Sequence, residues 1–116
     1  MSGGTSYQLL IDVSQPLRRR IGRLGTFDFP VGRYVYTGSA DRNLEQRIAR
    51  HLRAQKAMHW HIDYLLAASG VRVIKVIRSR RGECALNQAA PGRVWVLGFG
   101  ASDCRADCGA HLKYLG

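Results

Sequence analysis

The chain has 116 residues, of which 46% are hydrophobic, and its formal net charge at neutral pH is +10. This length predicts a single domain over residues 1–116, and this composition excludes an intrinsically disordered chain. The basic charge predicts a polyanionic partner, with nucleic acid as the first candidate, because arginine and lysine release condensed counterions when they contact phosphate. No apolar run is long enough to span a membrane and the first residues do not resemble a signal peptide, so we expect a cytoplasmic protein without a membrane partner.

The first part of the chain predicts two strands and an insertion between them. Residues 7–13 alternate loosely between apolar and polar and predict the first strand, and residues 33–37 predict the second, with Tyr34 and Tyr36 on one face. Residues 17–29 carry apolar side chains interrupted by glycines and predict a strand followed by a loop. The insertion is a candidate nucleic-acid contact because three consecutive arginines stand near its start, Arg18, Arg19 and Arg20.

A basic helix is predicted after the second strand. Asp41 or Asn43 can cap it, and its apolar stripe extends to about Gln55. Basic residues recur on it at every third position, namely Arg47, Arg50, Arg53 and Lys56. Of these, Arg50 and Arg53 are candidate contacts to nucleic acid. A further helix opens at residue 59 and ends before Gly70.

The remaining chain alternates strands and short helices. We expect a strand over residues 71–77, a helix over 83–90, a short strand over 94–97 and a last helix over 104–114. This element order predicts an α/β fold with a small central, mainly antiparallel sheet flanked by helices.

Four side chains in the first half suit phosphodiester chemistry, which needs a group to activate water and a cation to stabilise developing charge. Tyr7 and Tyr36 are candidates for the first task, provided that nearby cations favour the phenolate over a phenol of ordinary pKa. Arg47 is a candidate clamp for the phosphate, and His51, four residues later on the same helix face, can orient water or protonate the leaving oxygen. The alternatives are sheet tyrosines with purely structural roles and a histidine bonded to a neighbour on its helix.

Glu83 is a candidate ligand for one Mg²⁺ ion, a hard cation that prefers oxygen ligands. It opens the predicted helix over residues 83–90, so the competing interpretation is an acidic residue favoured there by the helix dipole. Glu45 is interpreted as a solvated helix residue.

The three cysteines are an odd number without a secretion signal, which indicates a reducing compartment with free thiols or a metal site. A Cys₃His zinc site is one candidate, and its ligands would be Cys84, Cys104, Cys108 and His111. The spacing lacks a C-x-x-C pair, so buried small thiols are the alternative. Asp63 stands four residues after His59 and can bond to it on a helix.

Several of these residues together resemble the GIY-YIG nuclease superfamily. Tyr7 stands where the tyrosine of the first motif would be, and residues 36–38 stand for Y-I-G. The pattern continues with Ser39, Leu44, Arg47 and His51, and then with Glu83 at the start of a later helix. A small stand-alone branch is more similar still, through G-x-Y-V-Y-x-G-S-A at 32–40, H-W-H-I-D-Y-L at 59–65 and G-F-G-x-S-D-C at 98–104.

The resemblance implies a small antiparallel sheet flanked by helices and the hydrolysis of phosphodiester bonds with one divalent metal ion. Our first hypothesis is therefore a metal-dependent endonuclease that acts on DNA, with RNA as the alternative substrate. The resemblance also implies that Tyr7 is the general base that activates water, with Tyr36 and His51 in support. It further implies that Arg47 stabilises the phosphate and that Glu83 binds Mg²⁺ or Mn²⁺.

The chain departs from the family pattern in three places. Tyr7 and Tyr36 are 29 residues apart, which is a longer insertion than in typical members. Thr5-Ser6-Tyr7 replaces Gly-Ile-Tyr, and Asn87 follows Glu83 too closely to match the downstream asparagine of the family. A catalytically inactive nucleic-acid-binding module of the same fold is therefore one alternative function, and a small zinc-stabilised protein is the other.

Overall fold

The computed structural model describes residues 6–40, 43–53, 58, 60–96, 98–99 and 110–116. These residues form an α/β fold on a five-stranded sheet of order β5-β1-β4-β7-β6, in which every neighbouring pair is antiparallel. The strands are β1 (Ser6–Val13), β4 (Gly32–Ser39), β5 (Val71–Ser79), β6 (Arg93–Val94) and β7 (Leu112–Tyr114). The predicted fold class, a small, mainly antiparallel sheet flanked by helices, is confirmed.

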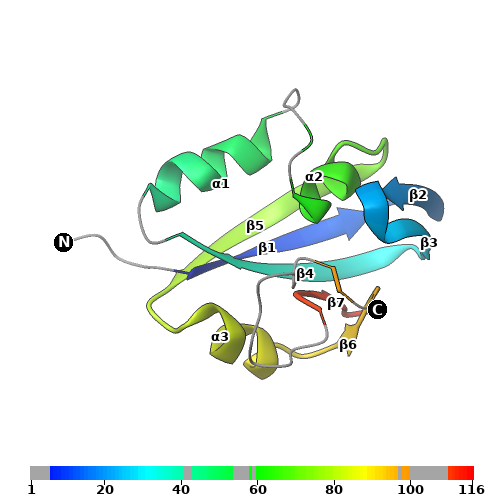
Figure 1. Cartoon of the computed structure of the whole chain (residues 1–116). Helices are drawn as coiled ribbons and strands as arrows, with labels where there is room; N and C mark the ends of the chain where they lie inside the picture. The colour runs from blue at the N-terminus through cyan, green and yellow to red at the C-terminus, as the bar shows by residue number, and fades with distance from the viewer. Residues whose placement is uncertain (1–5, 41–42, 54–57, 59, 97, 100–109) are drawn as a thin grey trace.

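Helices cover both faces of the sheet (Figure 1). The helices α1 (Leu44–Leu52) and α2 (His61–Leu66) lie on one face, and α3 (Glu83–Ala89) lies on the other. Alternate side chains of β1 are buried in one apolar cluster together with residues of α1 and α2. The buried side chains of β1 are Tyr7, Leu9, Ile11 and Val13. The period-two alternation of β1 thus places Tyr7 on the face that α1 covers.

The insertion between β1 and β4 is a hairpin, which corrects the predicted strand followed by a loop. The strands β2 (Leu17–Ile21) and β3 (Gly25–Phe29) pair with each other and are joined by the short 3₁₀ helix η1 (Gly22–Leu24). Gly22 and Gly25 have φ values of 50° and 126°, which glycine adopts readily. The two glycines therefore allow the chain to turn back into β3, whereas the sequence pattern predicted a loop there. The hairpin packs on α2, at the end of the sheet away from the start of β1 (Figure 1).

The C-terminal helix predicted over residues 104–114 is wrong in the part that the structure describes. Residues 112–114 form β7, which pairs with residues 34–36 of β4, whereas residues 104–109 lie outside the described chain. On the side of β4 that faces β7, the backbone N–H and C=O groups need hydrogen-bond partners. A neighbouring strand provides these partners, whereas a helix would not. The sheet therefore decides the conformation of this short segment.

Other strands also differ in length from the prediction, and β4, expected over residues 33–37, spans Gly32–Ser39. β5 continues from Ile77 to Ser79, because its last residues pair with the beginning of β1, where Ser79 lies opposite Ser6. The strand expected over 94–97 is only Arg93–Val94. Val96 has a φ of 65°, a left-handed conformation that takes the chain out of the sheet.

The helix ends also differ by a few residues. α1 ends at Leu52 and not near residue 55, since Arg53 is already extended. Asn43 precedes α1 in a left-handed conformation and makes no side-chain cap, and Asp41 lies outside the described residues. Within the described chain, no helix combines the length and the apolar character that crossing a membrane requires.

Candidate active site

The predicted site residues meet at the end of the sheet where β1 begins and β4 ends. Tyr7 on β1 lies directly opposite Gly38 on β4. The tyrosine ring lies so close to the glycine that a Cβ atom on Gly38 would be 2.5 Å from the ring carbon Cζ and 2.5 Å from the hydroxyl oxygen of Tyr7. Glycine at this position is therefore what allows the Tyr7 ring to lie across β4.

Tyr7 and His51 form a buried hydrogen-bonded pair. The Tyr7 hydroxyl oxygen is 2.6 Å from Nε2 of His51, and the two residues are 1% and 2% exposed. Tyr36 completes an aromatic group, with its ring centroid 6.4 Å from that of Tyr7 and 6.1 Å from that of His51. The structure thus brings together three of the residues that the sequence singled out for proton transfer.

The ionisation of the two tyrosines differs from the expectation. Burial raises the pKa of Tyr7 above the usual value for a phenol, and it outweighs the opposing charge of Arg47. Burial likewise raises the pKa of Tyr36 well above its ordinary value. Both side chains are therefore neutral phenols at neutral pH in this structure.

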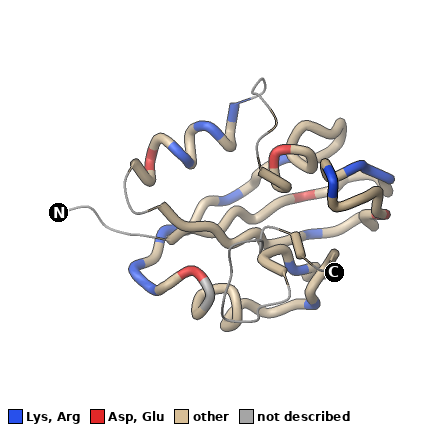
Figure 2. The backbone as a smooth tube through the Cα atoms, viewed as in Figure 1, with Lys and Arg blue, Asp and Glu red and all other residues tan. Residues whose placement is uncertain are grey.

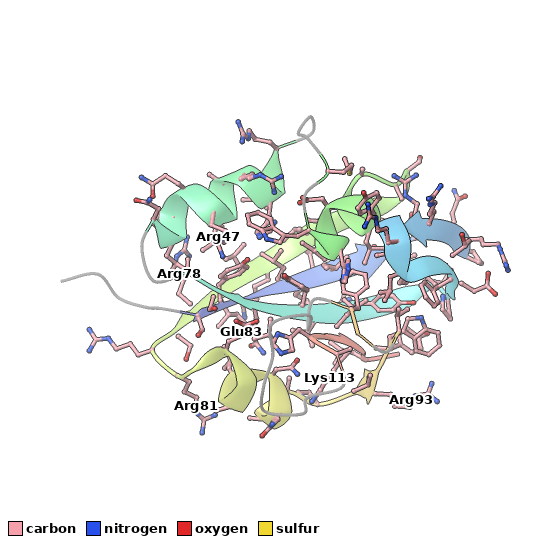
Figure 3. The ribbon with its side chains drawn as sticks, viewed as in Figure 1. Arg47, Arg78, Arg81, Glu83, Arg93 and Lys113 are labelled. Atoms are coloured by element: carbon pink, nitrogen blue, oxygen red, sulfur yellow. The ribbon has the colours of Figure 1, made fainter. Side chains whose placement is uncertain are left out.

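Arg47 reaches from α1 to the end of β4. Its Nη1 donates a hydrogen bond to the backbone carbonyl of Ser39 at 2.5 Å, and its guanidinium carbon lies 4.8 Å from the ring centre of Trp60. Arg47 thus lies next to the Tyr7 end of the sheet, while Glu83 approaches the same end from α3 (Figure 3).

Glu83 is held by donors from two other segments. Its Oε1 accepts a hydrogen bond from the Ser39 hydroxyl at 2.5 Å, and its Oε2 lies 2.5 Å from Nδ1 of His111. Burial by itself raises the pKa of Glu83, but the hydrogen bonds from His111 and Ser39, with the charges of His111 and Arg47, outweigh it and lower that pKa. Glu83 is therefore an ionised carboxylate, and it also occupies the first turn of α3, as the helix-dipole interpretation expected.

Mg²⁺ or Mn²⁺ fits this carboxylate as a ligand. The Glu83 side chain is 28% exposed, and each of its oxygens has a second acceptor position beside its hydrogen bond. Magnesium commonly keeps several waters and takes other ligands from substrate phosphates, so one protein carboxylate suffices. Among the described residues, no three His, Cys, Asp or Glu side chains are grouped so that they could hold a metal ion by themselves.

The zinc hypothesis falls largely outside the described chain. Cys104, Cys108 and the side chain of Cys84 are not among the described residues. The fourth candidate, His111, is 1% exposed and faces Glu83 through Nδ1. The zinc site therefore stays a prediction.

The basic residues lie in separate regions, along α1, near the end of β5 and in the hairpin (Figure 2). Arg50 donates to both carboxylate oxygens of the fully buried Asp63, at 2.9 Å and 3.0 Å, whereas Arg53 is exposed at the end of α1. Arg50 is thus part of the internal structure, and Arg53 is the better placed of the two for an external contact.

The hairpin arginines lie away from Tyr7, at the opposite end of the sheet (Figure 1). Arg18 pairs with Asp28 at 3.2 Å on the surface, and Arg19 donates to the Tyr64 carbonyl at 2.8 Å. Arg20 donates to the carbonyl of Gly22 at 3.2 Å. A nucleic acid that touched both regions would therefore extend along the length of the sheet.

Two contacts that build the site have no signal in the sequence. Glu83 meets His111, and Arg50 meets Asp63, although each pair joins segments that are distant in the chain. Asp63 was expected to bond to His59, which lies outside the described residues. Asn87 is fully buried and donates to the Ala110 carbonyl at 2.8 Å, so it belongs to the packing of α3.

Comparisons with known proteins assign the chain to a family. Neither the curated proteins nor the solved structures contain a match. A family model does match, over nearly the whole chain, and it is described as a domain of unknown function, DUF123. Because this match covers residues 6–116, the protein belongs to the DUF123 family.

Proposed function

We propose that the protein is a divalent-metal-dependent endonuclease that hydrolyses phosphodiester bonds in DNA. The observation that carries the proposal is the convergence of the Tyr7–His51 pair, Arg47 and Glu83 at one end of the sheet, from β1, α1 and α3. The resemblance to the GIY-YIG superfamily supports the same chemistry for the same residues. The net charge of +10 supports a polyanionic substrate.

Tyr7 and His51 together can activate water without a stored phenolate. As a water molecule transfers a proton to the Tyr7 oxygen, the Tyr7 proton moves to Nε2 of His51 along the 2.6 Å hydrogen bond. The raised pKa of Tyr7 is compatible with this proton transfer, because Tyr7 is a neutral phenol both before and after the step. His51 must begin the step with Nε2 unprotonated.

Arg47 binds the scissile phosphate in this scheme. One of its five N–H groups is used by the Ser39 carbonyl, and the guanidinium can direct others to phosphate oxygens as a planar fork. The bond to Ser39 also fixes the side chain before substrate arrives. Arg47 therefore stabilises negative charge that develops on the phosphate in the transition state.

Glu83 is the residue that would hold the metal ion. Its lowered pKa keeps the carboxylate ionised, and the bond between the Ser6 hydroxyl and the Arg81 carbonyl, at 2.6 Å, anchors the segment before α3 to the start of β1. When bound there, Mg²⁺ or Mn²⁺ supplies positive charge that polarises the phosphate. Ser39 and His111 orient the carboxylate toward the same end of the sheet.

A nucleic-acid-binding module without cleavage is the second candidate. The observation that favours it is the burial of Tyr7, which is 1% exposed, because a general base must reach a water molecule. Such a module would show salt-dependent binding without products.

The test is a cleavage assay on labelled single-stranded, duplex and flapped DNA and on RNA, with Mg²⁺ or Mn²⁺. Tyr7→Phe should lower the rate about 10²–10⁴-fold, the usual contribution of a positioned acid–base group. Glu83→Gln should also lower the rate, because it removes the negative charge that would hold the metal ion. Tyr34→Phe and Glu45→Gln are matched controls on residues outside the site and should retain cleavage. Cleavage that survives in both site variants would refute the proposal, and tight binding without cleavage would establish the binding module.

A further inference from the structure

We propose that Asp63 is a positioning residue whose buried carboxylate keeps His51 in the tautomer that accepts the Tyr7 proton. The catalytic consequence rests on the function proposed above, whereas the tautomer itself can be measured in the resting protein. The proposal extends the Tyr7–His51 pair into a series of three residues that runs from β1 through α1 to α2.

Asp63 is fully buried on α2, and donors surround its carboxylate. Arg50 donates to Oδ1 at 2.9 Å and to Oδ2 at 3.0 Å, and the backbone N–H of Trp60 donates to Oδ2 at 2.9 Å. The same Oδ1 lies 3.9 Å from Nδ1 of His51. Bonds from two segments therefore fix a carboxylate oxygen on the side of the imidazole that faces away from Tyr7.

The position of Asp63 Oδ1 determines which nitrogen of the His51 ring carries the proton in the favoured tautomer. At 3.9 Å the contact is longer than a hydrogen bond, so the carboxylate acts on His51 through its charge. A negative charge beside Nδ1 favours the proton on that nitrogen and leaves Nε2 as the acceptor. The same charge stabilises the imidazolium that forms when Nε2 receives the Tyr7 proton, as in catalytic triads.

Three described neighbours of His51, namely Tyr7, Tyr36 and Trp60, leave this choice open. The Tyr7 hydroxyl can donate or accept, so its 2.6 Å bond is compatible with either tautomer. Tyr36 from β4 and Trp60 from α2 present aromatic rings, with centroids 6.1 Å and 5.7 Å from that of His51.

Arg50 holds the carboxylate in place. Its guanidinium bridges both carboxylate oxygens and also lies 4.5 Å from the Trp60 ring centre, while Asp63 binds the Trp60 backbone. This arrangement fixes the rotation of the carboxylate, so that Oδ1 remains toward His51. A purely structural ion pair would have the same bonds, and the test must therefore read the state of His51 directly.

The test is ¹⁵N NMR of the His51 ring in wild-type protein, at a pH where the ring is neutral. We expect a proton on Nδ1 and none on Nε2. A wild-type ring protonated on Nε2 would overturn the inference without any variant. This measurement remains decisive if an Asp63 variant fails to fold, because Tyr7 alone does not select the tautomer.

Two variants separate positioning from stability. Asp63→Asn replaces the carboxylate by an amide that can donate toward Nδ1, and it should shift the proton toward Nε2. Arg50→Lys loses the bidentate fork but keeps the carboxylate and a cation beside it, so it should shift the tautomer less than Asp63→Asn does, even where it lowers the unfolding midpoint as much. An unchanged tautomer in folded Asp63→Asn, or the same shift in both variants, would overturn the inference.

Kinetics supply the second readout. Asp63→Asn should lower kcat by about 10²–10⁴-fold with little change in KM, by analogy with the effect of replacing a triad aspartate. A fall in kcat without a change of tautomer would contradict the inference. If the wild-type tautomer is as expected and wild-type protein does not cleave, only the proposed function fails.

Discussion

Replacing Gly38 with alanine is the sharpest test of where Tyr7 lies. A Cβ on Gly38 would be 2.5 Å from Cζ and from the hydroxyl oxygen of Tyr7, and 3.0 Å from Cε1. Non-bonded carbon atoms attract one another best at about 3.5–4.0 Å, so the ring must move. Gly38 has no positive φ, and the whole cost of the substitution therefore comes from this contact.

The magnitude follows from what holds the Tyr7 ring. Overpacking a buried site costs about 1–3 kcal/mol, and moving the hydroxyl away from His51 loses a hydrogen bond with a net contribution of about 0.5–1.5 kcal/mol. Gly38→Ala should therefore lower the free energy of unfolding by about 1.5–4.5 kcal/mol. Gly82→Ala is the matched control, because a Cβ there meets nothing within 4 Å and Gly82 has an ordinary φ of −60°.

The assay is urea unfolding with linear extrapolation of the free energy to water. Gly82→Ala should lie within about 1 kcal/mol of wild type, because reduced freedom of the unfolded chain opposes a poorer helix cap. In a Tyr7→Ala background, Gly38→Ala should cost much less than in wild type, since the ring is already absent. Equal stability of the two glycine variants, or full additivity with Tyr7→Ala, would refute the placement of the ring.

Three further predictions concern charged residues. Arg50→Ala removes the bidentate partner of the buried Asp63 carboxylate and should lower the free energy of unfolding by about 3–5 kcal/mol. Arg53→Ala, at an exposed position, should change the free energy of unfolding by no more than about 0.5 kcal/mol. Equal effects of the two variants in urea unfolding would contradict this prediction. The pKa of Glu83 is lowered below its ordinary value of 4.5, so its carboxylate stabilises the fold above that pH and loses this contribution on acidification. The difference in unfolding free energy between wild type and Glu83→Gln should therefore become smaller below pH 4.5. A difference that does not change with pH would refute this prediction. Arg18→Ala with Arg20→Ala should reduce the salt slope of DNA binding by about 1.8, and an unchanged slope would remove the hairpin from the binding surface.

The elements that the sequence predicted best are those with a long local pattern. The β-branched run of β5 and the alternation in β1 specify strands by themselves, and the apolar stripe of α1 specifies a helix. These elements were enough to predict the α/β class and its mainly antiparallel sheet. The segment that forms β7 has only three residues in the sheet, and no local pattern separates it from a short helix.

For the candidate site residues, too, the sequence predicted what depends on local spacing and did not predict what depends on long-range contacts. Helical spacing predicted that Arg47 and His51 share one face of α1, and both do reach the sheet end beneath that helix. The spacing could not predict their different partners, because Tyr7 and Ser39 come from two strands of the sheet. The hydrogen bond between Tyr7 and His51 exists only once α1 packs on β1.

The ionisation of Tyr7 depended on burial, which the sequence did not reveal. From the sequence, a phenolate required that a nearby cation such as Arg47 favour it, whereas the loss of solvent around the ring raises the pKa of Tyr7 and keeps the phenol neutral. The sequence likewise did not reveal that Arg50 and the backbone of Trp60 hold the carboxylate of Asp63.

The sequence by itself determined the class of fold, the positions of the principal elements and the residue types that suit phosphodiester chemistry. These depend on periodicity and local propensity, which act between neighbours along the chain. Only the tertiary structure decided that Tyr7 meets His51 across Gly38, that Glu83 meets Ser39 and His111, and that the hairpin arginines lie at the far end of the sheet. Those contacts join segments distant in the chain, and sheet pairing with helix packing brings them together.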